Sequence, residues 1–515
     1  MAKIYIYGSS GLEFCFALLC LRFIGASFYE VQGYFVPTLV IVGIHFGLAC
    51  WRPRAALFVF SLAVPWLSGL CQIQLLASAS PIFLGFSALW LGSSTRRWLY
   101  SKEQPAKASP ADFKSTYSRV ILALDLLIAV LLISTAYAIW PQRPDPNLWP
   151  TFTRISGLGF GDPYYALHSA FLWLQGLYFL KLLLRSPRCE VLYLCEANRS
   201  LIEPRKESAI AKWFGLLLIA YVVPLGGFST FQYFYKIPDP LGDFLLSPYE
   251  DIHSLGGVAV AIWAGALAMV ATRRKWLFAL QLLSVGPLTM LLVMTYSRAT
   301  WLAAVIGVLL LVGLRFKTKW LVLVILASVT LWWTANESAK KGGVWTNNPL
   351  MARLHSLIRV ESLSTKSSAR FELYHKALGM IQSRPWTGHG CGSFYLTSPK
   401  FALKNDPLGA EPNFAHNFIL QFATELGIPA ALLFCGLIGA ASHKGYRLSR
   451  AAWKQKNGDL VPLALFLALT TYLITQMTAN ALNIYVSHQF LFWFLMAALL
   501  TLPDSKTENR PNAIG

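Results

Sequence analysis

The chain has 515 residues, of which 55% are hydrophobic and only 13% are charged, and its mean hydropathy is +0.50. A soluble chain carries about 25% charged residues, so this composition excludes an ordinary soluble globular protein. It predicts an all-α protein that crosses a membrane many times. The eight cysteines include no CxxC pair, so the sequence offers no support for a metal site, and no cofactor is expected.

About 14 apolar runs are long enough to span a bilayer, which predicts a bundle of 12–14 transmembrane helices. The predicted spans are 10–28, 34–51, 55–74, 79–95, 118–140, 164–185, 209–232, 254–271, 276–296, 299–315, 319–335, 416–441, 459–479 and 482–502.

Lysine and arginine gather in alternate short loops, from Arg52 and Arg54 to the segment 444–456. Positively charged loops stay on the cytoplasmic side, so both termini are predicted in the cytoplasm and the alternate loops on the outer side of the membrane. This distribution accounts for the net charge of +20 without a nucleic-acid partner.

The resulting organisation has five parts and no internal repeat. They are an N-terminal transmembrane region (1–253), transmembrane helices that include a Ser297-Arg298 turn (254–335), a large outer loop with short helices (336–415), C-terminal transmembrane helices (416–502) and a disordered cytoplasmic tail (503–515).

The predicted span at 416–441 begins with one polar side. Asn417, Gln421 and Glu425 follow at intervals of four residues, which places them on one helix face. Polar groups at membrane depth are costly and usually face a protein interior or a wet cavity. His416 lies at the start of this face and titrates near neutrality, so it is the candidate proton acceptor. Glu425 either orients a partner or is itself a base with a raised pKa.

The large loop is basic, with ten lysines and arginines against five acidic residues. Positive charge on the outer side runs against the usual bias. An anionic ligand and anionic lipid head groups both remain open as the reason.

A helix is predicted over 368–384, ended by Pro385. Arg370 lies in its first turn, where a helix terminus already attracts anions. The alternating glycines of 387–394 then predict a tight turn, and a structural turn is favoured over direct ligand contact. The apolar stripe of this helix is predicted to be Phe371, Tyr374, Leu378 and Ile381.

Arg298 follows Ser297 at the outward end of a predicted span. An arginine at this depth needs a partner or water, and its planar fork suits phosphate oxygens. A snorkelling interfacial arginine is the alternative. Asp125 and Arg22, also within predicted spans, are expected to make structural polar contacts or ion pairs.

Taken in order, these blocks resemble the O-antigen ligase and polymerase superfamily of bacterial membrane glycosyltransferases of GT-C type, which includes protein O-oligosaccharyltransferases. The resemblance covers about 276–440. It rests on Ser297-Arg298, on Arg370 leading into Ala377-Leu378-Gly379-Met380-Ile381 with Pro385, on Gly388-His389-Gly390-Cys391-Gly392-Ser393-Phe394, and on His416-Asn417-Phe418-Ile419-Leu420-Gln421 continuing to Glu425-Leu426-Gly427-Ile428.

The resemblance implies transfer of a glycan from an undecaprenyl-pyrophosphate carrier to an acceptor hydroxyl at the periplasmic face of the inner membrane, without a metal or a nucleotide sugar. It implies that Arg298 and Arg370 hold the pyrophosphate and that His416 is the base, with Glu425 in a catalytic or orienting role and Asn417, Gln421 and Ser297 in support.

The acceptor stays open between a lipid A core sugar, a growing glycan and a protein hydroxyl, and membrane lipids are expected partners. Two functions of other classes remain. A small-anion or bicarbonate transporter would usually show inverted repeats, which are not detected. A lipid-carrier flippase would line a central cavity with charge, whereas the spans before residue 250 hold few charged residues.

Overall fold

The structure is a computed structural model that describes residues 2–30, 35–72, 81–100, 116–140, 162, 164–185, 221, 252–269, 275–295, 297–315, 330, 360–403, 413–454 and 460–502. The spans predicted at 209–232 and 319–335 lie outside these residues except for Tyr221 and Thr330. The tail at 503–515, most of the loop at 233–253 and the first part of the large loop also lie outside them.

Every element in the described part of the chain is a helix. In chain order they are α1 (Ala2–Glu30), α2 (Phe35–Trp51), α3 (Pro53–Gln72), α4 (Pro81–Tyr100), α5 (Thr116–Ile139), α7 (Tyr165–Arg185), α9 (Ile252–Met269), α10 (Lys275–Met294), α11 (Arg298–Arg315), α14 (Val360–Ser383), α15 (Phe394–Thr397), the 3-10 helix η3 (Ser398–Phe401), α16 (Phe418–Leu426), α17 (Ile428–Lys454), α18 (Val461–Gln476), α19 (Ala481–Ile484) and α20 (Val486–Thr501).

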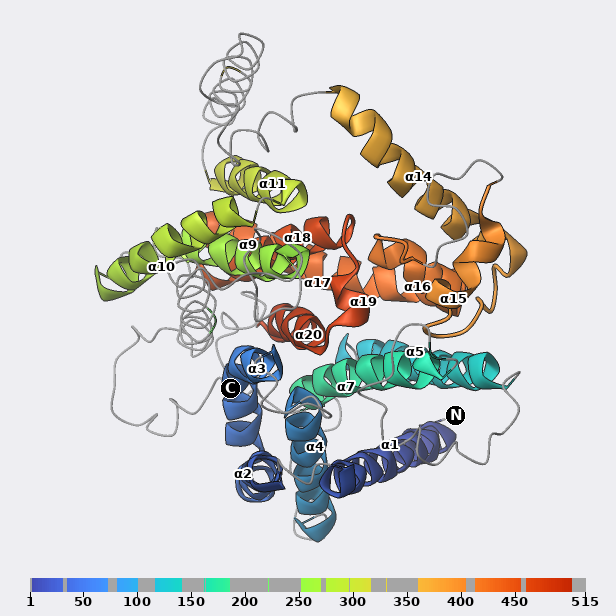
Figure 1. The fold of residues 1–515 in the computed structure, drawn as a ribbon. Coiled ribbons are helices and arrows are strands. Elements are labelled where there is room, and N and C mark those ends of the chain that lie inside the picture. The colour runs from blue at the N-terminus through green and yellow to red at the C-terminus, as the bar shows by residue number, and fades with distance from the viewer. Residues whose placement is uncertain are drawn as a thin grey trace, which may run out of the picture.

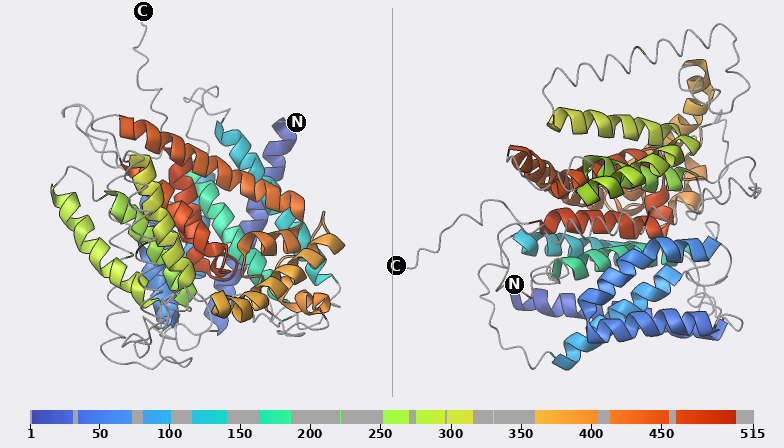
Figure 2. Two further views of the ribbon diagram at one scale, coloured as in Figure 1. Left: turned by 90° about the horizontal axis from the view of Figure 1, so that it is seen from above. Right: turned by 90° about the vertical axis from the view of Figure 1, so that its left-hand side faces the viewer.

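Helix α7 lies at the centre of the bundle. It packs against α20, α5, α4 and α19. Of the residues in its most apolar stretch 83% are buried, compared with 33% of those in the most apolar stretch of α17. Figure 1 shows α1–α4 on one side of α5 and α7, and α9–α11, α17 and α18 on the other. In the right-hand view of Figure 2 the long helices run along a common direction, and α14 lies at one end of them.

The apolar helices make this a membrane protein. Among the described residues, three helices are long and apolar enough to cross a membrane, namely Arg119–Ile139, Tyr165–Leu184 and Ile428–Ala452, and seven shorter apolar helices accompany them. Each predicted run except those at 209–232 and 319–335 contains a described helix. The number of transmembrane helices and the side on which each loop lies stay predictions.

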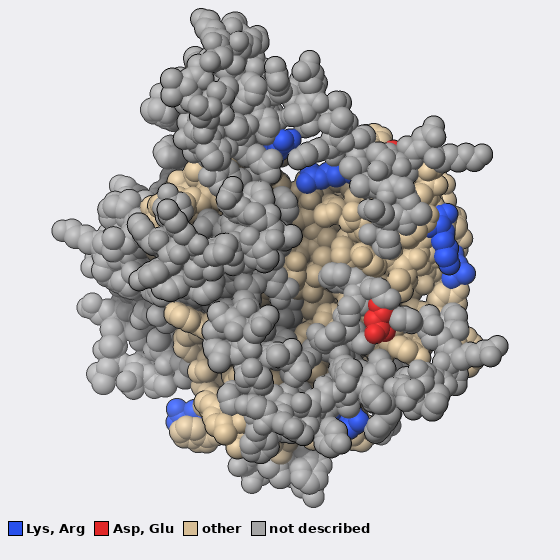
Figure 3. Space-filling model, viewed as in Figure 1, with Lys and Arg blue, Asp and Glu red and all other residues tan. Residues whose placement is uncertain are grey.

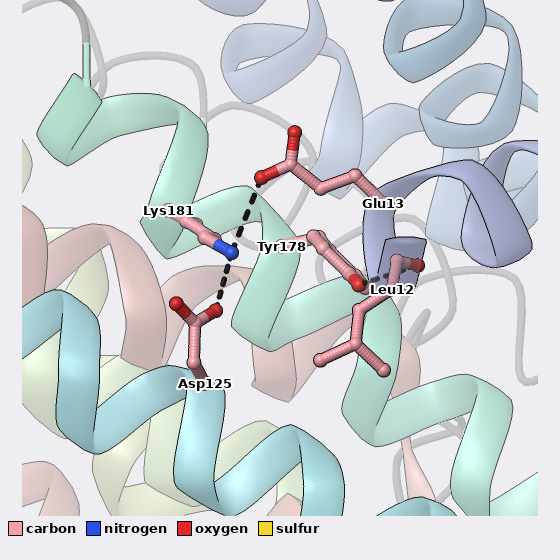
Figure 4. A network of polar contacts seen from close by, with 5 residues as sticks. All are labelled: Leu12, Glu13, Asp125, Tyr178 and Lys181. Carbon is pink, nitrogen blue, oxygen red and sulfur yellow. Dashed lines mark hydrogen bonds and ion pairs between the residues drawn. The ribbon is translucent and has the colours of Figure 1, made fainter. Parts of the chain in front are cut away.

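A buried ion-pair network joins α1, α5 and α7 (Figure 4). The Lys181 ammonium contacts the Asp125 carboxylate and lies 3.2 Å from that of Glu13. The Lys181 side chain is fully buried, and Tyr178, one turn earlier, donates a hydrogen bond to the Leu12 carbonyl at 3.0 Å. The expectation of a structural ion pair at Asp125 is therefore confirmed. A buried charge is tolerated because its partners replace water.

Two predicted spans are interrupted in the structure. The run 416–441 forms two helices, α16 and α17, and the run 482–502 forms the short α19 followed by α20. In the first case Gly427 stops the helix with a φ of 86°, which glycine adopts at little cost. The next amide, of Ile428, donates to the Pro385 carbonyl at 2.8 Å instead of continuing α16.

Candidate active site at one end of the helix bundle

Helix α16 carries most of the polar residues predicted for the site. Asn417 is its N-cap, and the Asn417 side-chain oxygen accepts from the amides of Ile419 and Leu420, each at 3.1 Å. Asparagine is among the residues that satisfy the unpaired amides of a helix start best. Asn417 therefore does not line the polar face with Gln421 and Glu425 as predicted, because its side chain turns back onto the first turn.

The glycine-rich turn 387–394 closes over the other end of α16. The amide of His389 donates to the Thr424 carbonyl at 2.9 Å, and the amide of Gly390 donates to the Glu425 carbonyl at 3.0 Å. The hydroxyl of Ser134, near the end of α5, donates to the same Glu425 carbonyl at 3.1 Å. Carbonyls that the helix leaves open are thus satisfied by a loop that comes from another part of the chain.

The predicted tight turn is present, and its glycines are needed for this fit. Gly388, Gly390 and Gly392 all have positive φ, at 65°, 111° and 69°. A Cβ at Gly388 would overlap the Glu425 backbone carbonyl and lie 2.7 Å from the Gly427 amide nitrogen. The turn and the end of α16 therefore interlock at a spacing that excludes a side chain.

The Glu425 carboxylate is buried between these two segments. Oε2 accepts from the Gly392 amide at 2.8 Å, and Oε1 accepts from Gln421 Nε2 at 3.0 Å. Helix α16 lies outside the three long candidate spans. Burial raises the pKa of the Glu425 carboxyl from its ordinary value of 4.5 to about 7, although hydrogen bonds from Gly392, Gln421 and the Phe394 backbone act in the opposite direction.

A relay of side-chain amides leads away from Glu425. Asn480 Nδ2 donates to Gln421 Oε1, and Asn483 Nδ2 donates to Asn480 Oδ1 at 2.7 Å. A carboxylate only accepts hydrogen bonds, so Gln421 must turn its amide nitrogen towards Glu425. The Gln421 oxygen then faces Asn480 and accepts from its amide nitrogen, and the Asn480 oxygen accepts from Asn483 in the same way. In its ionised form, Glu425 thereby fixes the direction of the whole relay.

His416 is half buried and has a φ of 48°, a left-handed conformation that is uncommon for a residue with a side chain. Ala415, just before it, packs in a small apolar cluster with Ala377, Met380 and Phe394. Ala377 and Met380 lie on α14, so this cluster fixes the start of α16 against that helix. Unusual backbone conformations of this kind concentrate at functional sites.

Arg370 is exposed on α14, two turns before Ala377. The predicted helix is present but begins earlier, at Val360, so the placement of Arg370 in its first turn was wrong and Arg370 lies inside the helix. The apolar stripe proposed from the sequence is wrong, because Phe371 is 77% exposed and Leu378 is 49% exposed. The buried face is about one-third of a turn away, at Leu373, Lys376, Ala377 and Met380, and α14 packs against both α16 and η3.

Arg298 is the first residue of α11, as the sequence indicated. The Ser297 hydroxyl accepts from the Thr300 amide at 3.4 Å, so Ser297 caps the helix start. A cation at a helix N-terminus opposes the helix dipole, whereas an anion bound there would be attracted by both the dipole and the arginine.

The elements that carry these residues surround the carboxyl end of α18. At the start of α9, Gly256 lies against Thr300 of α11, and its neighbour Gly257 lies against Thr475 and Gln476 of α18. On α14, the Tyr374 hydroxyl, one turn after Arg370, donates to the Met477 carbonyl at 3.4 Å. Beyond α18, Asn480 bonds to α16. Segments far apart in the sequence therefore meet at one end of the bundle.

The structure joins some of the predicted residues and separates others. Gln421 and Glu425 are hydrogen-bonded to each other. Eight residues of helix separate Glu425 from Asn417, which is about 12 Å along the axis at 1.5 Å per residue. Glu425 is therefore too far from His416 to orient its ring directly. The roles of Arg298, Arg370, His416 and Glu425 stay predictions.

Sequence reasoning missed the partners that come from outside the matched motifs. Asn480 lies between two predicted spans, Asn483 lies at the start of the second of them, and Ser134 lies inside another predicted span. A pair of asparagines at the end of an apolar run was a visible signal, since amides are costly at membrane depth. No pattern in the sequence connects Ser134 to Glu425, 291 residues later.

Comparison with known proteins points to the same part of the chain. Residues 282–435 match a family model described as O-Antigen ligase. An O-antigen ligase of Pseudomonas aeruginosa is 28% identical over 324 residues, which make up 61% of this chain and 68% of that protein. The segment matched by the family model contains Arg298, Arg370, His416 and Glu425.

Proposed function

We propose that this chain, a member of the O-antigen ligase superfamily, transfers a glycan from an undecaprenyl-pyrophosphate carrier to an acceptor hydroxyl at the periplasmic face of the inner membrane. The observation that carries the proposal is the gathering of α11, α14, α16 and α19 at one end of the bundle. Three of these four helices hold a residue that the family resemblance marks as functional.

In the proposed reaction, Arg298 and Arg370 bind the pyrophosphate of the donor. Breaking the bond between the anomeric carbon and the pyrophosphate oxygen leaves more negative charge on the phosphate. Two guanidinium groups and the N-terminus of α11 favour that charge in the transition state. Loss of one such electrostatic contact typically lowers the rate by about 10²–10³.

His416 takes the proton from the acceptor hydroxyl as its oxygen attacks the anomeric carbon from the face opposite the leaving group. A single displacement inverts the configuration at that carbon, and the electron pair of the broken bond leaves with the pyrophosphate. The reaction as proposed needs no metal. Loss of a general base typically lowers a rate by about 10²–10⁴.

We assign ligation to a lipid A core as the preferred reaction, because the Pseudomonas aeruginosa relative is named an O-antigen ligase. The basic character of the large loop also suits an anionic acceptor. A polymerase would use the end of a growing glycan instead, and a protein O-oligosaccharyltransferase would use a serine or threonine.

Deletion of the gene tests the assignment. A ligase predicts lipopolysaccharide without its O-antigen ladder, with full-length glycan left on the carrier. A ladder reduced to a single repeat would identify a polymerase, and an intact ladder with an unglycosylated surface protein would identify a protein glycosyltransferase. Purified protein, carrier-linked glycan and acceptor should then give the joined product, and its absence would contradict the proposal.

A further inference from the structure

One face of α5 is apolar and exposed along its length. Ile133 is 70% exposed, and Leu122 and Leu126 belong to the same stripe. The stripe ends at the carboxyl end of α5 with Tyr137 and with Trp140, which is 87% exposed. Apolar residues followed by tyrosine and tryptophan are typical of a helix that passes from the hydrocarbon core to the lipid head groups.

Arg384 joins this boundary from the end of α14. Its guanidinium donates a hydrogen bond to the Tyr137 hydroxyl and lies 5.2 Å from the centre of the Tyr137 ring. The next residue but one, Trp386, is 75% exposed. Pro385, between them, accepts from the first amide of α17 at 2.8 Å. The arginine therefore lies where two of the candidate spans, α5 and α17, reach the same boundary.

A second exposed cation, Lys400, flanks the same histidine as Arg384. The ring of His389 lies 5.7 Å from that of Phe401, which follows Lys400, and His389 Nε2 lies 2.9 Å from the hydroxyl of Ser383, which precedes Arg384. Burial is the main cause that lowers the His389 pKa, and the two cations lower it further. Within the described part of the chain, no acidic side chain forms an ion pair with either cation. Figure 3 shows lysine and arginine atoms at the right-hand edge, where Figure 1 has α14 and α15.

We propose that Arg384 and Lys400 bind the phosphate of an anionic phospholipid whose acyl chains lie along the exposed stripe of α5. A guanidinium held by a tyrosine presents a fixed fork to phosphate oxygens. From Ile133 to Leu122 the stripe is about 16 Å long at 1.5 Å per residue. One leaflet of a bilayer has about 15 Å of hydrocarbon, so the stripe matches a single layer of acyl chains.

The bound lipid would support the candidate site from the side. The turn that holds Glu425 through the Gly392 amide begins three residues after Arg384. Fixing Arg384 at the membrane boundary restricts the first residues of that turn. The inference concerns a lipid-binding site and does not require that the protein transfers glycans, so either idea can fail without the other.

The test is lipid binding by the purified full-length protein in an uncharged detergent. We expect native mass spectrometry to retain one phosphatidylglycerol and not phosphatidylcholine. A titration with fluorescent phosphatidylglycerol should show about 30-fold weaker binding by the double variant Arg384→Gln, Lys400→Gln, since one surface cation contributes about five-fold. The charge-preserving variant Arg384→Lys, Lys400→Arg should bind within a few-fold of the wild type.

The matched control is Arg450→Gln, which removes an exposed arginine near the other end of α17 and should leave binding unchanged. Equal helix content by circular dichroism shows that the variants are folded. Unchanged binding by the double neutral variant, or equal binding of phosphatidylcholine, would overturn the proposal. So would displacement of the lipid by excess inorganic phosphate, or a preference for polyprenyl phosphate.

Discussion

Replacing Glu425 tests its structural role as the acceptor at the head of the amide relay. Glu425→Ala leaves the Gly392 amide and Gln421 Nε2 buried without an acceptor. An unsatisfied buried donor costs about 1–3 kcal/mol, so the variant should lose about 2–6 kcal/mol of stability. Glu425→Gln keeps the volume and one acceptor oxygen, and its new NH₂ group can donate to Gln421 if the amides of the relay all reverse.

Reversal of the relay is feasible because its last member can take it up. Asn483 Oδ1 is buried and has no partner among the described residues, so it can accept from Asn480 when the amides turn over. Glu425→Gln then loses only the difference between charged and neutral hydrogen bonds, about 1–2 kcal/mol. Thermal unfolding in detergent measures both variants. Equal destabilisation by alanine and glutamine would refute the relay.

The pH dependence of unfolding gives a second readout of the same residue. The Glu425 pKa is about 7 in the folded chain, above its ordinary value of 4.5. The folded state therefore gains stability from this group below pH 4.5 and loses it as the pH rises through 7. The full difference is at most about 3 kcal/mol. The melting temperature of the wild type should fall over this interval relative to that of Glu425→Gln, and parallel curves would contradict the reasoning.

Three further substitutions test the architecture by thermal unfolding. Lys181→Met should cost about 3–5 kcal/mol because it removes the cation that the buried Asp125 carboxylate contacts, and adding Asp125→Leu should restore most of the loss. Gly388→Ala should cost at least about 2 kcal/mol, since it combines a positive φ with backbone overlap. Gly436→Ala, in open space on α17, should cost nothing. Asn417→Ala should cost about 1 kcal/mol through the lost cap, and an unchanged melting temperature would contradict that role.

Local signals in the sequence were sufficient for the helices and for several turns. Apolar runs located the helices, and Ser297 and Pro385 fall at helix boundaries as expected. The break at Gly427 was also readable, because a glycine followed two residues later by proline favours the end of one helix and the start of another. A single span was nevertheless predicted, because the apolar run 416–441 is long enough to cross a bilayer.

The residues near Glu425 in the sequence do not predict its environment in the structure. Glu425 is buried by the glycine-rich turn 387–394, by α5 and by α19. These segments are far apart in the sequence and come together only in the folded chain. The predicted position of the apolar stripe around α14 was wrong for a related reason. Lys376 is 1% exposed, so its long side chain takes a place on the inner face that a hydropathy pattern gives to Phe371 or Leu378. Lysine can cover apolar surface with its methylene stem, which hydropathy does not record.

The transfer rate of purified variants tests the central claim most directly. Arg298→Ala, Arg370→Ala and His416→Ala are each expected to lower the joining of carrier-linked glycan to acceptor by at least about 100-fold, with melting temperatures near that of the wild type. Arg450→Ala, at the far end of α17, should keep the wild-type rate. Transfer at the wild-type rate by all three site variants would contradict the account.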